Sequence, residues 1–365
     1  MYGPSRIIAW FAVGLIGGGG LVAPGAAAAS TDLPRLHVLS VRRVYDQGPH
    51  NAFTDLCQFG GRYYLTFRNC PDGHMVHPTS SILILASEDG QQWKQVHRFH
   101  VDKRDTRDPH FLKFRGKLFV YTGTWYCGAT TPKKYEMNKQ LGYAVWTDDG
   151  RQWQGPRMLE GTYGHYVWRA ASYQGKAYLC GRRKHQFAET VSRAQRDRLI
   201  ESAMLESDDG LIWRYRAMFQ QHLGDETAFL FEPDGKVLAI GRRGGGGNAQ
   251  VLRSRPPYQD WQRADLKYEQ GDGSLGGPLL ATWQGHYLVG GRQTRAGKPV
   301  TVLSWLVRDR LHEAAILPSG GDNSYPGFVA QSKNRALVSY YSSHEKDPAG
   351  NTRTAIYVTQ LQMDE

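Results

Sequence analysis

The chain has 365 residues, of which 40% are hydrophobic and 12% aromatic, and it carries a formal net charge of +11. Glycine is abundant, with 42 residues, and there is little sustained 3.6-residue periodicity. This composition excludes a mainly helical protein and favours many short strands. Beyond the N-terminal segment there is no apolar run of about 20 residues, which excludes a second membrane-spanning helix.

The first 30 residues have the pattern of a secretory signal peptide. A positive charge at Arg6 precedes an apolar, glycine-broken run from Ile7 to Val22, and small residues follow up to Ser30. We therefore expect a soluble mature chain of residues 31–365 with a secreted or periplasmic location; a retained anchor is the alternative. For an exported basic chain, the expected partner is an acidic glycan or oligosaccharide and not nucleic acid. A merely basic, solvated surface is the competing interpretation.

One unit recurs along the mature chain: a strand, a tight turn, a second strand, a loop, and a third strand ending in an acidic turn and a tryptophan. The turns are Ser87–Trp93, Thr147–Trp153 and Ser207–Trp213, spaced 60 residues apart, with a degenerate copy at Ser254–Trp261. Hydroxyls and carboxylates in such turns bond backbone amides, and glycine accepts a positive φ. These turns therefore indicate a fold and not an active site.

The second strands are the most regular part of the repeat. They are expected at Arg62–Arg68, Lys117–Gly123, Lys176–Arg182, Lys236–Arg242, His286–Arg292 and Arg335–Tyr341. First strands are expected near Phe53, Asp108, Val167, Thr227, Pro278 and Phe328. Six such hairpins predict an all-β fold, a six-bladed β-propeller. The segment Leu36–Val44 is expected to pair with Thr354–Gln360 and close the ring.

The sequence leaves two local features open: a short helix and the pairing of the cysteines. Thr190–Ser202 is the segment expected to form a short helix. Among the four cysteines, a disulfide such as Cys57 to Cys70 could persist in an exported protein, although buried free thiols are also common. No CxxC spacing is present, and we expect neither a metal site nor a cofactor.

The ends of the second strands carry an unusual number of arginines. The last positions are Arg68, Gly123, Arg182, Arg242, Arg292 and Tyr341. Guanidinium groups gathered at one end of a channel repel one another, so a bound anion is a natural reason to assemble them. Arginine binds a carboxylate through two parallel hydrogen bonds, which lysine cannot do. The alternative is that each arginine pairs with a carboxylate of a neighbouring blade.

Two segments add a family resemblance to this pattern. The hairpin Asp225–Arg242 reads DETAFLFEPDGKVLAIGR, and Ser324–Phe328 reads SYPGF. Together with the acidic turns, they resemble the glutamate-to-arginine hairpin and the tyrosine strand of the sialidase superfamily. The resemblance implies that Tyr325 is a nucleophile, that Glu226 is its base, and that Arg242 and Arg292 belong to an arginine triad.

The chain departs from that family at its first arginine. The expected Arg-Ile-Pro motif is missing, and the corresponding strand, His50–Asp55, reads HNAFTD. Arg68, at the far end of the same hairpin, is the expected substitute. Arg107, Arg169 and Tyr341 complete the candidate substrate-binding residues. Tyr341 also competes with Tyr325 for the nucleophilic role, and Tyr325 could instead be a wall residue.

The general acid has several candidates. Asp108 and Asp55 lie in the first strands of the second and first repeats, where either could project into the channel mouth. For Asp108 a structural ion pair is the alternative. The loop residues Asp72, His74 and His77 are a third option, because sialidases have their acid in a loop at about this place.

The expected function is that of a retaining exo-glycoside hydrolase acting on a terminal acidic sugar. A neutral tyrosine nucleophile suits such a substrate, since two like charges about 4 Å apart repel by about 4 kcal/mol at an effective dielectric constant near 20. Sialidases differ from two-carboxylate glycosidases in this tyrosine. A non-catalytic propeller that binds acidic glycans and a polysaccharide lyase are the alternatives. A monomer is expected.

Overall fold

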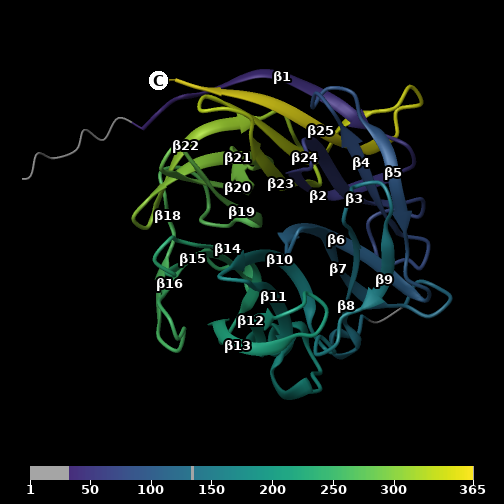
Figure 1. Cartoon of the computed structure of the whole chain (residues 1–365), viewed down its shortest axis with the longest axis vertical. Coiled ribbons are helices and arrows are strands. Elements are labelled where there is room, and N and C mark those ends of the chain that lie inside the picture. Colours follow the sequence, from purple (N-terminus) through teal and green to yellow (C-terminus); the bar gives the residue numbers. More distant parts are fainter. Residues whose placement is uncertain (1–32, 133–134, 365) are drawn as a thin grey trace, which may run out of the picture. The chain divides into compact units, whose positions relative to one another are not determined.

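The computed structural model describes residues 33–132 and 135–364, which form mainly antiparallel strands (Figure 1). The predicted signal peptide, residues 1–30, lies outside the described residues. Pro34–Glu365 form one compact unit in which consecutive strands pair through tight hairpins. Among the described helices, none has the length and apolar character needed to cross a membrane.

Each sheet contains strands that follow one another in the chain. The first group is β2 (His50–Phe59), β3 (Arg62–Cys70), β4 (Ser81–Ser87) and β5 (Lys94–Phe99). The second is β6 (Arg104–Phe114), β7 (Lys117–Tyr126), β8 (Leu141–Thr147) and β9 (Gln154–Met158). The third is β10 (Tyr166–Tyr173), β11 (Lys176–Lys184), β12 (Ile200–Ser207) and β13 (Arg214–Gln220).

The remaining groups follow the same order with two additions. One is β14 (Gly224–Phe231), β15 (Val237–Arg243), β16 (Gln250–Ser254) and β17 (Trp261–Asp265). The next is β19 (Gly276–Trp283), β20 (His286–Arg295), β21 (Lys298–Val307) and β22 (Arg310–Leu317), with β18 (Lys267–Tyr268) parallel to β22. The last is β23 (Asn323–Ala330), β24 (Arg335–Lys346) and β25 (Thr352–Met363), with β1 (Leu36–Tyr45) beside β25.

Both ends of the unit meet in the last group. β1 pairs antiparallel with β25 over most of its length, which confirms the expected partnership of Leu36–Val44 with Thr354–Gln360. Nearer its start, β25 makes one parallel pair with β2, between Thr354 and His50. The first and last groups are thereby joined in one sheet. The six expected second strands are also confirmed, as β3, β7, β11, β15, β20 and β24.

The first strand of each group is the inner one. β2 contacts β6, β6 contacts β10, β10 contacts β14, β14 contacts β19, β19 contacts β23, and β23 contacts β2. Buried side chains such as Phe67, Trp168 and Phe229 form a hydrophobic cluster that extends across several groups. Burial of a side chain of this size stabilises the fold by about 1.5 to 3 kcal/mol. The inner strands are thus held by packing on both sides.

The acidic turns have the structural role that their composition predicts. Oδ1 of Asp149 accepts hydrogen bonds from the backbone amides of Arg151 and Gln152 at 2.8 and 2.9 Å. Thr147 Oγ1 accepts from the amide of Gly150, whose φ is 72°. Asp89 and Asp209 make the same contacts in their turns.

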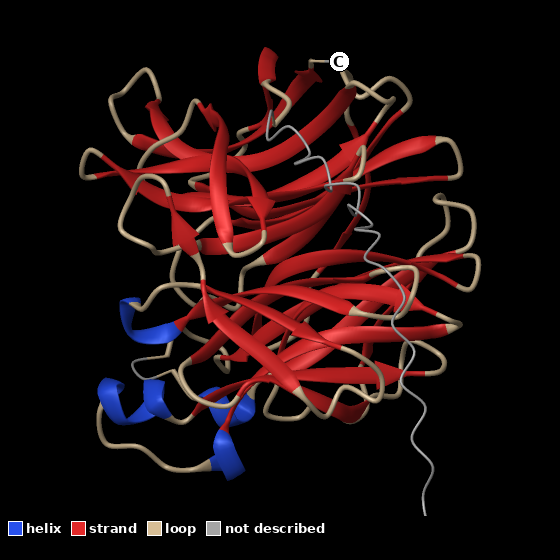
Figure 2. Cartoon of the chain, turned by 90° about the vertical axis from the view of Figure 1, so that its left-hand side faces the viewer, coloured by secondary structure: helices blue, strands red, loops and turns tan. Residues whose placement is uncertain are grey.

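Helices are few and short in the described part of the chain (Figure 2). They are the 3-10 turns η1 (Met137–Lys139), η2 (His185–Phe187) and η3 (Gly244–Gly246), and α1 (Arg193–Arg198). α1 is shorter than the expected Thr190–Ser202. All four cysteines are free. Cys57 pairs with Tyr64 near one end of the β2–β3 hairpin and Cys70 with His50 at the other, which explains why Cys57 and Cys70 form no disulfide.

Candidate active site

The same irregularity occurs in all six inner hairpins. Each of these hairpins consists of the first and second strands of one group. Between two consecutive backbone pairs of the hairpin, the first strand has two residues and the second strand has one. These shifts lie between Ala52 and Asp55, Arg107 and His110, Val167 and Ala170, Gly224 and Thr227, Gly276 and Leu279, and Ser324 and Gly327. Such β-bulges redirect side chains and are common beside active sites. Phe53, Asp108 and Tyr325 lie in bulges and have φ values of 64°, 51° and 51°.

Left-handed conformations at non-glycine residues cost on the order of 1 to 3 kcal/mol and are found where function requires them. The bulge that contains Tyr325 also contains Pro326, and the equivalent bulge of β14 contains Asp225 and Glu226. The predicted nucleophile and base therefore lie at the same level of two different inner strands.

The strand register corrects the expected alignment of the arginines. Arg68, Arg292 and Tyr341 stand opposite Ala52, Gly276 and Ser324, directly before the bulges. Arg243 has the equivalent position in β15, and Gly181 has it in β11. Arg182 and Arg242 are thus each displaced by one residue, a shift that the unaligned sequence does not reveal.

Tyr325 and Glu226 form a buried hydrogen-bonded pair. The Tyr325 hydroxyl donates to Glu226 Oε1 at 2.5 Å. Glu226 Oε2 accepts from Arg242 Nη1 at 3.0 Å and from the Gly277 amide at 3.2 Å. Tyr325 is 6% exposed and Glu226 4%. Burial, together with the charges of Glu226 and Asp108, holds the pKa of Tyr325 well above its usual value, so the phenol remains a hydrogen-bond donor.

Aromatic rings surround the Tyr325 side chain. Ring centroids lie at 4.9 Å for Phe53, 5.9 Å for Tyr341 and 6.1 Å for Trp168. Phe53 lies in His50–Asp55, the segment in which the family resemblance leads one to expect an arginine. Tyr341 is fully buried and donates to Asp322 Oδ1 at 2.9 Å. Each of the two tyrosines thus donates to a carboxylate, Tyr341 to Asp322 and Tyr325 to Glu226.

Asp108 is the carboxyl group with a raised pKa. Burial, reinforced by the nearby charge of Glu226, raises the pKa of Asp108 to about 7. Its Oδ2 accepts a short hydrogen bond from the Tyr166 hydroxyl, and its buried Oδ1 has no partner among the described residues. At neutral pH a protonated Asp108 can therefore offer a hydrogen bond to a ligand.

A cavity of about 620 Å³ lies at this end of the inner strands and is rich in arginine. Arg182, Arg242 and Arg292 are among its lining residues. Their Nη1 atoms donate to Asp225 at 2.5 Å, to Glu226 at 3.0 Å and to Asp322 at 3.1 Å, respectively. Within the described ranges, Nη2 of each of these three arginines makes no hydrogen bond to protein. The cavity can thus offer several unused guanidinium donors to an anionic group.

The predicted substrate-binding role of Arg68 does not agree with the structure. Arg68 has no exposed surface. Its five N–H groups reach Asp105 Oδ1 and Oδ2, the carbonyls of Gly73 and Met75, and His50 Nδ1. Because every N–H group of Arg68 is already hydrogen-bonded inside the protein, Arg68 cannot replace the missing arginine in binding a substrate carboxylate.

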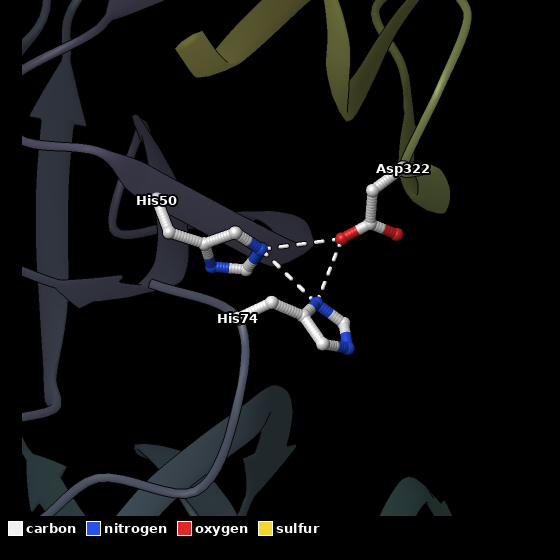
Figure 3. Close-up of side chains that lie close together, drawn as sticks. All are labelled: His50, His74 and Asp322. Carbon is white, nitrogen blue, oxygen red and sulfur yellow. Dashed lines mark hydrogen bonds and ion pairs between the residues drawn. The ribbon is translucent and has the colours of Figure 1, made fainter. Parts of the chain in front are cut away.

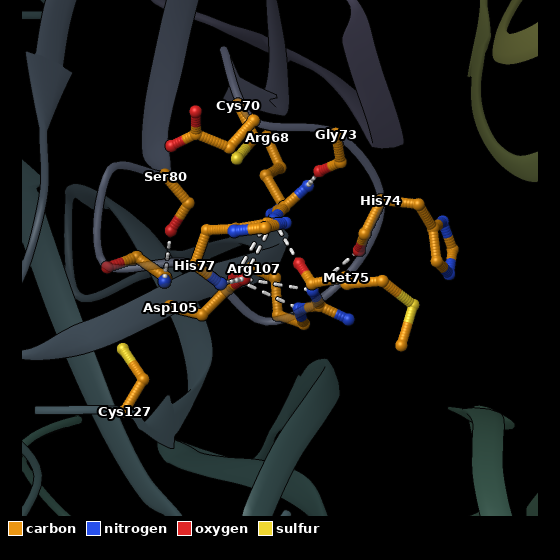
Figure 4. Close-up of polar contacts among 12 residues, drawn as sticks. Arg68, Cys70, Gly73, His74, Met75, His77, Ser80, Asp105, Arg107 and Cys127 are labelled. Carbon is orange, nitrogen blue, oxygen red and sulfur yellow. Dashed lines mark hydrogen bonds and ion pairs between the residues drawn. The ribbon is translucent and has the colours of Figure 1, made fainter. Parts of the chain in front are cut away.

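Arg107 belongs to the same buried ion cluster (Figure 4). It donates to both oxygens of Asp105 at 3.0 Å, and its Nη2 also donates to the carbonyls of His74 and Met75. The Asp105 carboxylate further accepts from the amide of His77 at 2.7 Å. Although burial opposes ionisation, Arg107 and Arg68 lower the pKa of Asp105 to about 2. Arg68, Arg107 and Asp105 together fix the backbone of residues 73–77.

Asp55 and Arg169 form an ion pair across the inner strands and are not free to act on a ligand. Arg169 Nη1 donates to Asp55 Oδ1 at 2.9 Å, and its Nη2 donates to the carbonyl of Pro326 at 2.7 Å. Asp55 Oδ2 accepts from the amide of Phe111. Burial opposes ionisation of Asp55, but Arg169, His110 and the Phe111 amide together outweigh it and lower the pKa of Asp55. These contacts correct the predicted roles of Asp55 as an acid and of Arg169 as a substrate ligand.

One carboxylate of the site was missed from the sequence. Asp322 accepts from Tyr341 and Arg292 on Oδ1, and its Oδ2 lies 3.2 Å from His50 Nε2 and 2.8 Å from His74 Nδ1 (Figure 3). These partners come from separate segments of the chain. Asp322 precedes the tyrosine strand in a glycine-rich loop without any motif, so no local signal could have singled it out.

The fold is an all-β, propeller-like succession of mainly four-stranded sheets, with a polar cavity at one end of the inner strands. No known family model matches the chain, and no curated protein matches its sequence. Solved structures with the same fold do exist, and their low sequence identity shows similarity of the fold alone.

Three solved structures illustrate the similarity. A protein of unknown function from Dyadobacter fermentans is 20% identical, with a TM-score of 0.72 over 91% of this chain and 100% of that chain. Trypanosoma rangeli sialidase in complex with sialic acid is 11% identical, with a TM-score of 0.62 over 93% of this chain. The match covers 59% of the sialidase chain. An α-L-arabinofuranosidase from Fusarium graminearum is 12% identical, with a TM-score of 0.60 over 88% of this chain and 97% of that chain.

Proposed function

We propose that the protein is an exported, retaining glycoside hydrolase that removes a terminal acidic sugar from a glycan. The observation that carries the proposal is the buried hydrogen bond of 2.5 Å from the Tyr325 hydroxyl to Glu226 Oε1. Export rests on the signal-peptide pattern of the first 30 residues. Residues 31–365 are the proposed catalytic domain, a six-bladed propeller, which the succession of contacts among the inner strands supports.

The proposed nucleophile is the Tyr325 oxygen. As it attacks the anomeric carbon, its proton passes to Glu226 Oε1, with which it is already hydrogen-bonded. Arg242 and the Gly277 amide hold Glu226 Oε2, so the carboxylate need not reorient during the transfer. The product of this step is an aryl glycoside, in which the anomeric carbon is bonded to the phenol oxygen, and water then hydrolyses it with net retention of configuration.

An acidic sugar is supported by the three arginines of the cavity. Arg182, Arg242 and Arg292 each keep Nη2 without a protein partner in the described part of the chain, and all three line the same cavity. A charged hydrogen bond to a substrate carboxylate contributes about 1.5 to 3 kcal/mol. The unpartnered Oδ1 of protonated Asp108 adds a donor for a sugar hydroxyl or ring substituent.

The experiment that tests the proposal is a turnover screen over 4-methylumbelliferyl glycosides of sialic acids and uronic acids, with neutral sugars as controls. NMR of the released sugar should show a first-formed product with the configuration of the substrate. A 2,3-difluoro analogue of the accepted sugar should label the protein, and peptide mass spectrometry should find the label on Tyr325. A label on a carboxylate would remove the tyrosine from the mechanism.

The alternatives predict different outcomes of the same screen. A non-catalytic glycan-binding propeller would bind acidic sugars without turning over any glycoside. A polysaccharide lyase would release an unsaturated product, detected by its ultraviolet absorbance, and would incorporate no solvent oxygen. Preferred hydrolysis of a neutral glycoside would retain the hydrolase but overturn the acidic substrate.

A further inference from the structure

The Asp322 carboxylate contacts four side chains: three are hydrogen-bonded to it, and His74 is an ion-pair partner. Oδ1 accepts from the Tyr341 hydroxyl at 2.9 Å and from Arg292 Nη1 at 3.1 Å. Oδ2 lies 2.8 Å from His74 Nδ1 and 3.2 Å from His50 Nε2. An ionised carboxylate has about four lone-pair sites, so these contacts account for all of them. Asp322 is consequently fixed in place and has no free site for a role of its own.

The contacts of His50 and His74 settle where their hydrogens lie. Arg68 can only donate, so His50 Nδ1 accepts from it, and the remaining hydrogen of neutral His50 is on Nε2, facing Asp322. The separation of 2.8 Å between His74 Nδ1 and the carboxylate oxygen requires a hydrogen between them, since two lone pairs would repel. We therefore assign a hydrogen to His74 Nδ1, an atom that also lies 3.1 Å from His50 Nε2.

The other ring nitrogen of His74 is available. Figure 3 shows it pointing away from His50 and Asp322, and it makes no hydrogen bond to a described residue; the 3.1 Å contact between the His74 ring and His50 Nε2 is made by Nδ1. The His74 side chain is 49% exposed. A carboxylate that fixes Nδ1–H and leaves Nε2 free is the arrangement in which a histidine exchanges protons with a substrate.

The position of His74 is fixed by its backbone as well. Arg107 binds the His74 carbonyl, and Arg68 and Arg107 both bind the Met75 carbonyl (Figure 4). The His74 ring lies 6.0 Å from the ring of Phe53, and Phe53 lies 4.9 Å from Tyr325. The half-exposed imidazole and the proposed nucleophile thus adjoin the same aromatic side chain.

Asp108 is less suited to repeated proton exchange. It is 4% exposed and tied to the Tyr166 hydroxyl, whereas a group that protonates a leaving oxygen and then activates water must meet water in each turnover. Its buried, protonated carboxyl instead suits a constant hydrogen bond to the bound sugar. Asp72 and His77 bond to Thr79 and Thr131, outside the Asp322 cluster.

The same three side chains could also be considered as a cation site, because their donor atoms lie within 4.8 Å of one another. The hydrogen on His50 Nε2 argues against this. Coordination through Nε2 would move that hydrogen to Nδ1, where it would face the N–H of Arg68 at 3.2 Å. Histidines that bind a metal normally donate from the other nitrogen to an acceptor, which is absent at this position among the described residues.

We propose that His74, oriented by Asp322, is the general acid and base of the reaction; this inference rests on the proposed function. In the first step the glycosidic C–O bond breaks as Tyr325 attacks, and the leaving oxygen takes the proton that the imidazolium form of His74 carries on Nε2, which leaves neutral His74 with its hydrogen on Nδ1. In the second step water attacks the anomeric carbon and gives a proton to His74 Nε2, while the tyrosine oxygen leaves and recovers its proton from Glu226. Asp322 is the positioning residue.

The test compares two leaving groups on the sugar that the screen identifies. A 4-methylumbelliferyl group leaves with little acid assistance, whereas an alkyl alcohol needs it. His74→Ala should lower kcat/KM for the alkyl glycoside on the order of 10²- to 10⁴-fold and should affect formation of the glycosyl-enzyme from the aryl glycoside much less. Sodium azide should restore aryl turnover and yield a glycosyl azide, because it needs no base. Asp322→Asn should show the same dependence in weaker form.

His312→Ala is a matched control, because His312 also pairs with a carboxylate, Glu269, at 2.6 Å but lies on β22. It should leave both rates unchanged. Equal losses on both leaving groups in His74→Ala would make its role structural, and a leaving-group dependence in Asp108→Asn instead would assign the acid to Asp108. Loss of activity on chelation, with bound metal that disappears in His74→Ala, would establish a cation site in place of the acid.

A readout independent of turnover separates this inference from the proposed function. Long-range ¹H–¹⁵N NMR of the wild type should show His74 protonated on Nδ1, and Asp322→Asn should weaken that preference. A wild-type His74 with hydrogen only on Nε2 contradicts the proposal even if Tyr325 is labelled. If no glycoside is hydrolysed but His74 has the expected tautomer, the proposed function fails and the Asp322–His74 pair stands.

Discussion

Arg169 on β10 donates from Nη1 to Oδ1 of Asp55 on β2 at 2.9 Å, so two inner strands that are distant in the chain are joined by a buried ion pair. The Asp55 carboxylate also holds the amide of Phe111 on β6. These two residues, expected at first to serve the substrate, connect the scaffold beneath the site.

Asp55→Asn should therefore destabilise the fold. The variant keeps the shape of the side chain but leaves Arg169 as an uncompensated buried charge, which costs about 3 to 5 kcal/mol. Because Arg169 lowers the pKa of Asp55, the pair stabilises the folded state above the unfolded pKa of Asp55 and loses this effect as the pH falls. Urea unfolding at neutral pH measures the difference, and an unchanged midpoint would contradict the structural role.

Tyr325→Phe and Glu226→Gln should each lower kcat by orders of magnitude while substrate binding survives. The first removes the attacking oxygen and the second removes the base that accepts its proton. The double variant should be scarcely slower than the slower single variant, because residues that act as a unit are not additive. Single-turnover kinetics with the accepted glycoside give the three rates. Strictly multiplicative losses would mean that the two residues act independently.

Arg242→Ala and Arg292→Ala should weaken binding of an acidic sugar far more than binding of its neutral amide analogue. Loss of a charged hydrogen-bond partner costs about 1.5 to 3 kcal/mol, and only the acidic ligand has that partner. Isothermal titration calorimetry with both ligands measures the difference. Equal losses for the two ligands would remove the carboxylate from the proposed substrate.

Asp149→Ala should lower thermal stability and leave turnover of the folded enzyme nearly unchanged. The lost side chain accepts from the amides of Arg151 and Gln152, and loss of these bonds should cost on the order of 1 to 2 kcal/mol. Calorimetry and active-site-normalised kcat together check this expectation. A collapse of kcat with unchanged melting would place the site at the acidic turns.

Asp108 should make stability depend on pH in a definite direction. Its folded-state pKa of about 7 lies above the unfolded value of about 4, so between these values only the folded state holds the proton. Stability from this residue is therefore fully present below about pH 4 and is lost as the pH rises to about 7, with a limiting slope of about 1.4 kcal/mol per pH unit. Asp108→Asn should abolish this component, and urea unfolding of both proteins across the range isolates it from the histidines. Parallel profiles would show that the carboxyl titrates normally.

Sequence patterns predict the repeat because each strand and turn is encoded locally. The acidic turns, the glycine-led second strands and the pairing of β1 with β25 all depend on residues that lie close together or alternate regularly. Tyr325 and Glu226 also stand in recognisable short segments. Their hydrogen bond, however, requires two inner strands to meet, so the sequence predicts the candidates and only the structure provides the contact.

Long-range pairing decides the rest of the site, and no local pattern encodes it. Arg68 has the same sequence context as the other strand-ending arginines, yet Asp105 from the next group neutralises it. Asp322 has no motif, and His50 reaches it from the opposite end of the unit's sequence. Two of the second strands reach the pair before the bulge after one residue fewer or one residue more than the others, which displaces Arg182 and Arg242 from their expected positions. A shift of one residue reverses the face on which side chains project.

The extra residue in every inner hairpin divides the inner strand into two parts that are under different structural constraints. Between the bulge and the hairpin turn, side chains must keep the alternation that fills the hydrophobic interior. Above it the alternation starts afresh, so Phe53, Asp108, Gly277 and Tyr325 could be exchanged during evolution without changing the face that any interior residue presents. In such a scaffold the residues at the bulges can change and bring new chemistry to the site, while packing alone conserves the hydrophobic interior. This accounts for a common fold shared at 11 to 20% identity.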